Sequence, residues 1–283
     1  MFTEALREAF FDSLQMLPFL FAAFLILEAV EHYSSGFMKK ALYKVGRAGP
    51  VAGSVLGCIP QCGFSVIAAN LYSGGIITLG TLLAVFIATS DEAILILMGN
   101  PGRGSDILNL IVTKIIIAVI AGYGVDIFFR RRSEGKKEIG EICDHCGCHE
   151  GHGGILMPAL RHTAKIFLYV LAFNLVLEVA LDWIGAQRLS EYMLKDSLIQ
   201  PFIAALIGMI PNCASSVILT ELYLSGAISF ASVVSGLCTG AGIGLVVLLK
   251  MNHNPKENLK IVGLLYGISV VAGVVIQLFG GLF

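Results

Sequence analysis

Eight long apolar runs constrain the fold of this chain more than any other feature. Each run is close to the ~20 residues that cross a ~30 Å hydrocarbon core as a helix. Of the 283 residues, 56% are hydrophobic and 14% are charged, which is far more apolar than a water-soluble domain of this length. The sequence therefore predicts an all-α, polytopic membrane protein. The runs cover residues 13–33, 51–72, 76–98, 107–129, 164–183, 198–224, 227–249 and 261–283.

The chain contains one pattern twice, with an offset of 151 residues. GCIPQCGFSV at 57–66 returns as GMIPNCASSV at 208–217, and the similarity continues beyond the motif. Internal repeats in a membrane chain are typical of transporters built from two related halves, with the binding site at their interface. We predict a first membrane repeat at 1–129, a linker at 130–158 and a second membrane repeat at 159–283.

Lysine and arginine clusters predict that the two repeats are inverted. Basic residues gather around Lys40, Lys137 and Lys256, and the positive-inside rule places all three clusters in the cytoplasm. Three apolar runs separate the first cluster from the second, so one of them must enter and leave on the same face. Residues 51–72 are the best candidate, because Pro60 breaks that run.

We therefore expect three crossings plus one Pro-broken, re-entrant helix in each half. The linker then lies in the cytoplasm, whereas both termini and the loops near Gly102 and Arg188 lie outside. The alternative is eight full crossings in two parallel halves, which would place one basic cluster outside.

Polar residues gather where the two Pro-broken segments would meet near the middle of the membrane. Irregular backbone is tolerated there only where it is buried in protein or lines a cavity. Each proline is expected to open a half-helix, and the cysteine in the first turn is then favoured as a thiolate by the helix dipole. Thiolates select soft or borderline ions such as trivalent arsenic, Cd, Zn or Cu(I). The predicted substrate-binding residues are Pro60, Gln61, Cys62, Ser65, Pro211, Asn212, Cys213 and Ser216.

Two other interpretations of the motif stay open. The prolines could kink packed helices, with the cysteines as small buried hydrophobes, although the duplication favours a site. Cys58 and Cys62 could also form the redox pair of a membrane thiol oxidoreductase, but Met209 replaces Cys58 in the second copy. A metal-sensing membrane protein is a further alternative to a transporter, and we expect no enzymatic activity.

Charged residues inside the apolar runs are candidates for ion coupling, since charge within a bilayer is costly and usually functional. Glu28 and Glu178 occupy matching places in the two halves, unless each simply reaches interfacial water. Asp91 and Glu92 have no acidic counterparts, and the helical rise places Asp91 at a depth similar to Lys114. Both a structural ion pair and a coupling site are possible there. No nucleotide-binding motif occurs, so a proton or other ion gradient is the predicted driving force.

The linker carries a second set of metal ligands. Residues 141–154 read EICDHCGCHEGHGG, in which thiolates and imidazoles are sufficient for a tetrahedral, zinc-type site. We interpret this stretch as a flexible loop that captures metal, the alternative being incidental metal binding. The predicted ligands are Cys143, His145, Cys146, Cys148, His149 and His152.

The duplicated Pro-Gln/Asn-Cys-x-x-Ser-Val motif, the two-half layout and the Cys/His linker resemble the ten-helix heavy-metal exporter family. That family is related to the arsenical permeases and is in places labelled a manganese transporter. The resemblance covers the whole chain and implies an efflux permease for a toxic metal or metalloid, with Cys62 and Cys213 at the matching motif positions. Manganese is a harder ion that suits thiolates poorly.

We predict a secondary transporter that exports soft heavy-metal or metalloid ions by alternating access. Its partners are the lipid bilayer, a proton or other ion gradient and the ion itself, for which Zn, Cd, Mn, Cu and As(III) are candidates. No cofactor and no nucleic acid are expected.

Overall fold

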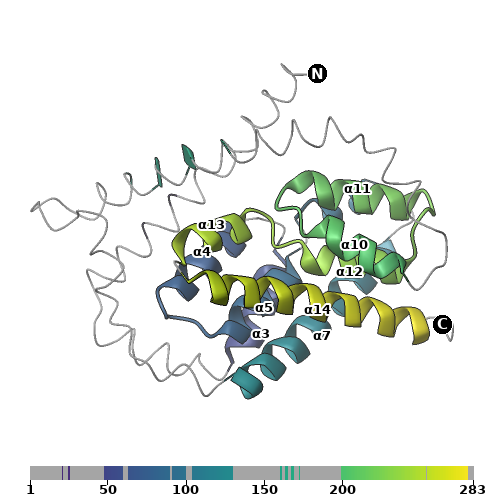
Figure 1. The fold of residues 1–283 in the computed structure, drawn as a ribbon. Coiled ribbons are helices and arrows are strands. Elements are labelled where there is room, and N and C mark those ends of the chain that lie inside the picture. The colour runs from purple at the N-terminus through teal and green to yellow at the C-terminus, as the bar shows by residue number, and fades with distance from the viewer. Residues whose placement is uncertain are drawn as a thin grey trace, which may run out of the picture.

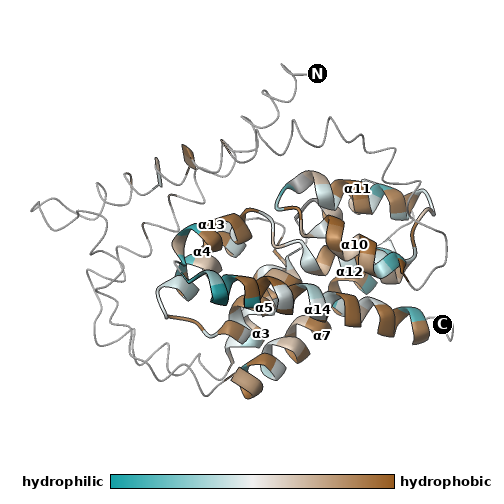
Figure 2. Cartoon of the chain, viewed as in Figure 1, coloured by the Kyte–Doolittle hydropathy of each residue, from teal (hydrophilic) through white to brown (hydrophobic). Residues whose placement is uncertain are grey.

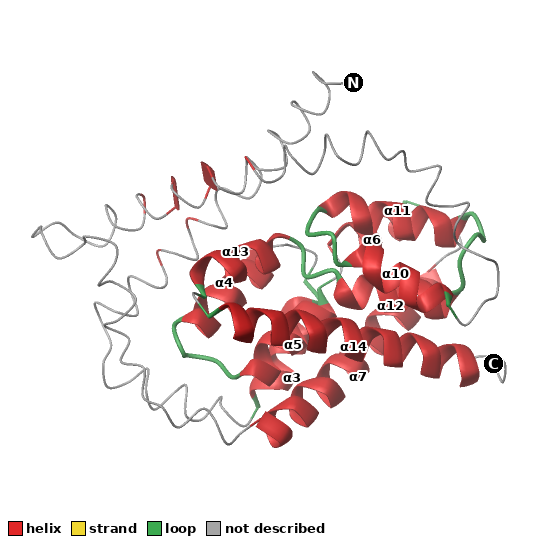
Figure 3. Ribbon diagram, viewed as in Figure 1, coloured by secondary structure: helices red, strands yellow, loops and turns green. Residues whose placement is uncertain are grey.

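The computed structural model describes residues 48–59, 63–89, 91–99, 104–129, 199–252 and 254–279, with isolated positions at 21, 25, 160, 163, 164, 167, 168 and 172. Every regular element in these segments is an α-helix and none is a strand (Figure 3). The predicted all-α fold class is confirmed.

The described helices form two series of five that follow each other in the same order (Figure 1). Each helix of the second series begins and ends within two residues of the position that the 151-residue offset predicts. The sequence repeat is therefore a repeat of helices. The first series is α3 (Gly49–Gly57), α4 (Gly63–Ser73), α5 (Leu79–Ala88), α6 (Asp91–Met98) and α7 (Gly104–Phe129). The second is α10 (Gln200–Gly208), α11 (Cys213–Leu224), α12 (Phe230–Thr239), α13 (Ile243–Met251) and α14 (Pro255–Phe279).

Each series has two interrupted helices, of which the sequence predicted only the Pro-broken one. The prediction of a continuous crossing over 76–98 is wrong, because α5 ends at Ala88 and α6 begins at Asp91. The matching run 227–249 is interrupted as well, between α12 and α13. There Gly242 has a φ of 54°, a left-handed conformation that glycine adopts readily and that a right-handed helix cannot contain.

The Pro-broken segment of the first half folds back on itself, as expected for a re-entrant helix. A Cβ atom on Gly49, at the start of α3, would meet the Thr81 side chain in the first turn of α5. A Cβ atom on Gly57, at the end of α3, would lie 2.6 Å from the Val85 carbonyl oxygen near the end of α5. Because α3 and α5 run in the same direction, α4 between them has to run back.

The second half repeats this arrangement with hydrogen bonds. Ser235 Oγ of α12 donates to the Pro201 carbonyl near the start of α10, at 3.0 Å. Thr239 Oγ1 at the end of α12 donates to the Ala205 carbonyl, at 2.8 Å. The helices α10 and α12 are therefore parallel, and α11 reverses the chain between them.

The long helices α7 and α14, which correspond in the repeat, run in opposite directions. Asp126 near the end of α7 binds the N-terminus of α5, and Lys114 in its middle binds Thr89 directly after α5, so α7 is antiparallel to α5. The repeat of helices gives α14 the same relation to α12. Lys114 also reaches Leu237 near the end of α12, and the first turn of α7 lines a pocket with the start of α12, so α7 is parallel to α12. Accordingly, Lys260 Nζ in the second turn of α14 lies 3.3 Å from the ring centre of Phe129, the last residue of α7. Inverted halves require this opposite course.

Three segments among the described residues are long and apolar enough to cross a membrane. They are Gly104–Phe129, Phe230–Met251 and Pro255–Phe279, and the middle one contains the break at Gly242. Only 28% of the first and third is buried, against 83% of the second, so α12 and α13 form the centre and α7 and α14 face outward. Figure 2 shows the apolar colouring of these helices, with hydrophilic residues at the beginning of α14. That helix begins six residues before the predicted start at 261, so Lys256 and Lys260 belong to its first turns rather than to a loop.

The outer helices pack on the rest of each half through one glycine at equivalent positions. A Cβ atom on Gly122 of α7 would lie 2.7 Å from Pro50 Cβ of α3 and 3.2 Å from Ala84 Cβ of α5. Its counterpart Gly273 of α14 would meet Pro201 of α10 at 2.9 Å and Ser235 of α12 at 2.6 Å. Three helices of each half therefore form a trio in close backbone contact.

We predict that replacing Gly208 by alanine destabilises the protein. Its Cβ atom would overlap the Gly236 carbonyl of α12 and lie 2.5 Å from Thr239 Oγ1, and overpacking of this kind costs about 1–3 kcal/mol. Thermal unfolding of the purified protein in detergent measures the effect. Gly267→Ala is the matched control, because a Cβ atom there meets nothing within 4 Å and alanine is the better helix former. Equal melting temperatures of the two variants would contradict the close α10–α12 contact.

Candidate functional site

Ends of half-helices from both repeats meet at the buried side chain of Lys114. This residue lies in the middle of α7, and its side chain is fully buried. Its ammonium group donates to the carbonyl of Thr89, directly after α5, and to that of Leu237 near the end of α12, the latter at 2.8 Å. The C-terminal end of a helix carries free carbonyls and the negative pole of the dipole. A cation is therefore stabilised where the two helices end.

Two thiols lie close to this ammonium group. Cys58 follows the last residue of α3 and is half-buried, whereas Cys238 in α12 is fully buried. Both are free cysteines, and Lys114 is near enough for its charge to act on each of them. Neither has a thiol at the equivalent position of the other repeat, where Met209 and Ile87 stand.

The serines of the two motifs lie against one segment, the break between α12 and α13. A Cβ atom on Gly244, in the first turn of α13, would lie 2.6 Å from Ser65 Cβ of α4. A Cβ atom on Gly240, directly after α12, would lie 3.7 Å from Ser216 Oγ of α11. Two positions that are 151 residues apart in the sequence thus come to the same five-residue segment.

The second motif begins α11 much as expected, with one correction. Cys213 is the first residue of α11 and therefore lies in its first turn, and the buried Asn212 is the N-cap. Pro211 precedes the cap, so the expectation that it opens the helix is wrong. Prolines do lie in the first turns of α3 and α10, at Pro50 and Pro201, a second repeated pair that the sequence analysis did not single out.

Ser215 holds the break in this motif and was missed by sequence reasoning. Its hydroxyl lies 2.8 Å from the Asn212 carbonyl and 3.1 Å from the Ile210 carbonyl, so it adds a side-chain bond to the turn that precedes α11. The signal used in the sequence was duplication, and Ser215 has none because Phe64 is its counterpart.

Several predicted residues lie outside what the structure describes. The backbone of Asp91, Glu92 and Cys213 lies in helices, but their side chains are outside the described part, so pairing of Lys114 with the two acids stays a prediction. In the described segments, no three His, Cys, Asp or Glu side chains are grouped to hold a metal ion. The positions outside the described residues are Pro60, Gln61, Cys62, Glu28, Glu178, Cys143, His145, Cys146, Cys148, His149 and His152.

The centre of the molecule therefore presents helix ends of both polarities. Carbonyls at the ends of α5 and α12 bind Lys114, while the N-terminal turns of α11 and α13 flank the break that follows α12. Interrupted helices from two repeats that meet at one place are the architecture with which secondary transporters bind substrates and ions. The fold defines a multi-pass helical membrane protein.

Comparison with known families gives the same result. The family model described as "Putative, 10TM heavy-metal exporter" matches residues 1–182 and 155–282. The chain belongs to this family, which confirms the resemblance seen in the sequence and supports a role in heavy-metal export. Comparisons with curated proteins and with solved structures gave no match.

We predict that Lys114→Met abolishes transport. Methionine has a similar unbranched side chain but no donor, and each buried carbonyl left unsatisfied costs about 1–3 kcal/mol. Uptake of radioactive Cd²⁺ or As(III) into proteoliposomes is the measurement, with thermal unfolding to confirm folding. Leu265→Met is the control, since Leu265 is the fully buried counterpart of Lys114 in α14. Wild-type uptake by the Lys114 variant would show that the contact has no role in transport.

Proposed function

We propose that the protein is a secondary transporter that exports soft heavy-metal or metalloid ions by alternating access. The observation that carries the proposal is the meeting of half-helix ends from both repeats around Lys114. In a bundle of uninterrupted helices, free carbonyls and helix N-termini lie at the two ends of the bundle and not together in its interior. Membership of the exporter family supplies the coarser statement of heavy-metal export, and the chemistry of the motifs supplies the preference for soft ions.

Cys62 and Cys213 are the proposed soft ligands. Each stands three residues, or one helical turn, before the motif serine of its own half. Since Ser65 and Ser216 both lie against the break between α12 and α13, thiols one turn away are suited to bind a single ion between the halves. Thiolate ligands favour As(III), Cd, Zn or Cu(I) over harder ions.

The polar residues of the motif would complete this site. Gln61 and Asn212 stand directly before the thiols and offer amide groups. Asn212 is buried as the N-cap of α11, which supports its part in the site. Pro60 and Pro211 keep the backbone open at this depth because proline lacks an N–H donor.

Lys114 is the proposed centre of ion coupling. Its ammonium group occupies the place that a bound cation takes in transporters with interrupted helices, between carbonyls of two helix ends. Asp91 and Glu92 follow two and three residues after Thr89, whose carbonyl Lys114 binds. A proton or cation that binds to these acids would change the electrostatic environment of Lys114. This change would couple the ion gradient to the proposed substrate site. Glu28 and Glu178 are proposed as further carriers in the first run of each half.

We further propose that the halves, 1–129 and 159–283, are inverted in the membrane and that the linker 130–158 is cytosolic. The antiparallel course of α7 and α14 supports this orientation. So does the position of Lys260 beside Phe129, because it brings the basic start of α14 to the end of α7 that Arg130 follows. Basic residues at both helix ends then face the cytoplasm together.

We expect Cys62→Ser and Cys213→Ser each to abolish transport of soft ions. Serine keeps much of the shape of cysteine but has no soft donor atom. Efflux of As(III) and Cd²⁺ from loaded vesicles, with equal amounts of folded protein, gives the comparison. Cys58→Ser and Cys238→Ser serve as matched controls and should have mild effects. Full export by the double variant Cys62→Ser, Cys213→Ser would mean that the substrate is not a soft ion.

The linker should raise capture of ions at low concentration without forming the path. Soft ions bind thiolate and imidazole tightly, but a polar loop cannot carry them through the hydrocarbon core. Replacing Cys143, Cys146 and Cys148 by serine should therefore raise the apparent KM more than it lowers maximal flux. Complete loss of flux at saturating substrate, in a folded protein, would place the linker in the path instead.

A further inference from the structure

A hydrogen bond between the two halves joins a Pro-broken hairpin to a long spanning helix. Tyr72, near the end of α4, donates its hydroxyl to Glu257 Oε1, at 2.5 Å. Glu257 lies in the first turn of α14, and 185 residues separate the two partners. The distance is at the short end of the range for a hydroxyl bound to a carboxylate, which is among the stronger hydrogen bonds in proteins.

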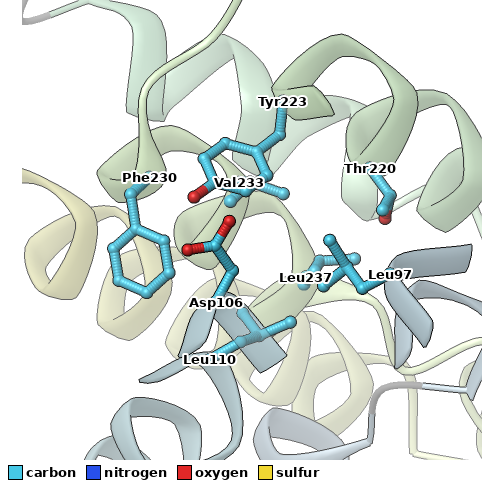
Figure 4. Close-up of a pocket in the computed structure, with 8 residues that line it drawn as sticks. All are labelled: Leu97, Asp106, Leu110, Thr220, Tyr223, Phe230, Val233 and Leu237. Carbon is cyan, nitrogen blue, oxygen red and sulfur yellow. The ribbon is translucent and has the colours of Figure 1, made fainter. Parts of the chain in front are cut away.

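The same pair of residue types occurs again with the halves exchanged. The 151-residue offset leads from Tyr72 to Tyr223, near the end of α11, and from Glu257 back to Asp106, in the first turn of α7. Asp106 and Tyr223 line one pocket together with Phe230 and point into it (Figure 4). The pocket leaves no room for a water molecule. The helix dipole favours an acidic residue in the first turn of a helix, which would account for the carboxylate alone. The dipole does not account for the tyrosine that lies opposite the acid in both copies.

The two pairs lie at opposite ends of the molecule. Each carboxylate is in the first turn of a long helix, and α7 and α14 run in opposite directions. At each end, the tyrosine lies in the second helix of one half's Pro-broken hairpin, which is α4 or α11. The acid lies in the long helix of the other half. In the proposed orientation, Tyr72–Glu257 is at the cytosolic face and Tyr223–Asp106 at the external face.

We propose that these pairs are the two gates of the transporter, each of which closes the path at one face by joining the halves. The inference rests on the proposed transport function. A transporter that alternates access has to open one seal while the other is closed. A contact between the halves at each end, to which each half contributes one helix, can open at one face and form at the other. Tyr72, Glu257, Tyr223 and Asp106 are thus positioning residues that set the conformational equilibrium and need not touch the ion.

Hydrogen–deuterium exchange of the full-length protein in lipid nanodiscs tests the proposal. Tyr72→Phe removes one hydroxyl group and should raise exchange about tenfold in the turn after α4 and the first turn of α14, the change expected from losing a hydrogen bond to a charged group. The same variant should lower exchange at the start of α7 and after α11, because opening one end closes the other. Tyr223→Phe should give the opposite pattern. Glu257→Ala removes the same contact from its other partner and should reproduce the Tyr72→Phe pattern.

Tyr266→Phe is the matched control, since its hydroxyl lies 3.4 Å from the Phe202 carbonyl within the second half. This variant should not raise exchange at one end of the molecule while lowering it at the other. Raised exchange at the mutated end alone would overturn the proposal and leave two ordinary structural contacts. So would unchanged exchange in both Tyr72→Phe and Tyr223→Phe.

Flux of Cd²⁺ and As(III) through the wild-type protein, compared with exchange in these variants, separates this proposal from the proposed function. Reciprocal exchange without flux of either ion would support the proposed gates and contradict the proposed soft-ion substrate. Flux of these ions without reciprocal exchange would contradict the gates and keep the substrate.

Discussion

A chain inside a bilayer has to bind every backbone N–H and C=O group from within the protein, because no water is present to do so. The interrupted helices of this protein leave such groups free at the centre, and the buried ammonium group of Lys114 binds two of them. Hydroxyl groups add further bonds near the breaks. Thr239 donates to the Ala205 and Gly236 carbonyls, and Ser215 donates to two carbonyls at the break before α11. Polar side chains therefore supplement the backbone bonds where the helices are interrupted.

The two halves share a backbone plan but differ in the side chains at its centre. Lys114 has Leu265 as its counterpart, and Asp91 stands where the second half has Gly242. The ammonium group of Lys114 lies between the ends of α5 and α12, so it is a contact that both halves share. Duplication accounts for the scaffold, whereas the ammonium group at its centre has no counterpart in the second half.

Much of the fold followed from the sequence, for physical reasons that also show where prediction stopped. The apolar runs and the 151-residue offset predicted the helices and their repetition, because membrane thickness fixes helix length. Proline marked one break in each half, since it removes a donor. The second breaks carry no proline and went unpredicted, because Thr89 and Gly242 interrupt a helix only through the backbone conformation that tertiary contacts impose. The acceptors of Lys114 are main-chain carbonyls, which no sequence pattern distinguishes.

The packing indicates which contacts can change when the halves move. The trios α3–α5–α7 and α10–α12–α14 are held by glycine contacts between backbones, so their relative positions are fixed within each half. The remaining arms form mixed pairs, α4 with α13 and α6 with α11, so each pair contains one arm from each half. Rotation of one trio against the other would therefore change the contacts within these mixed pairs. Near the centre such a pair is in tight van der Waals contact, as at Ser65 and Gly244, which resists sliding. At its outer end the same arm is joined to α14 by the hydrogen bond between Tyr72 and Glu257, whose two partners can bind water when the contact opens. Motion between the halves is therefore least restricted at the two ends of the molecule and most restricted near its centre.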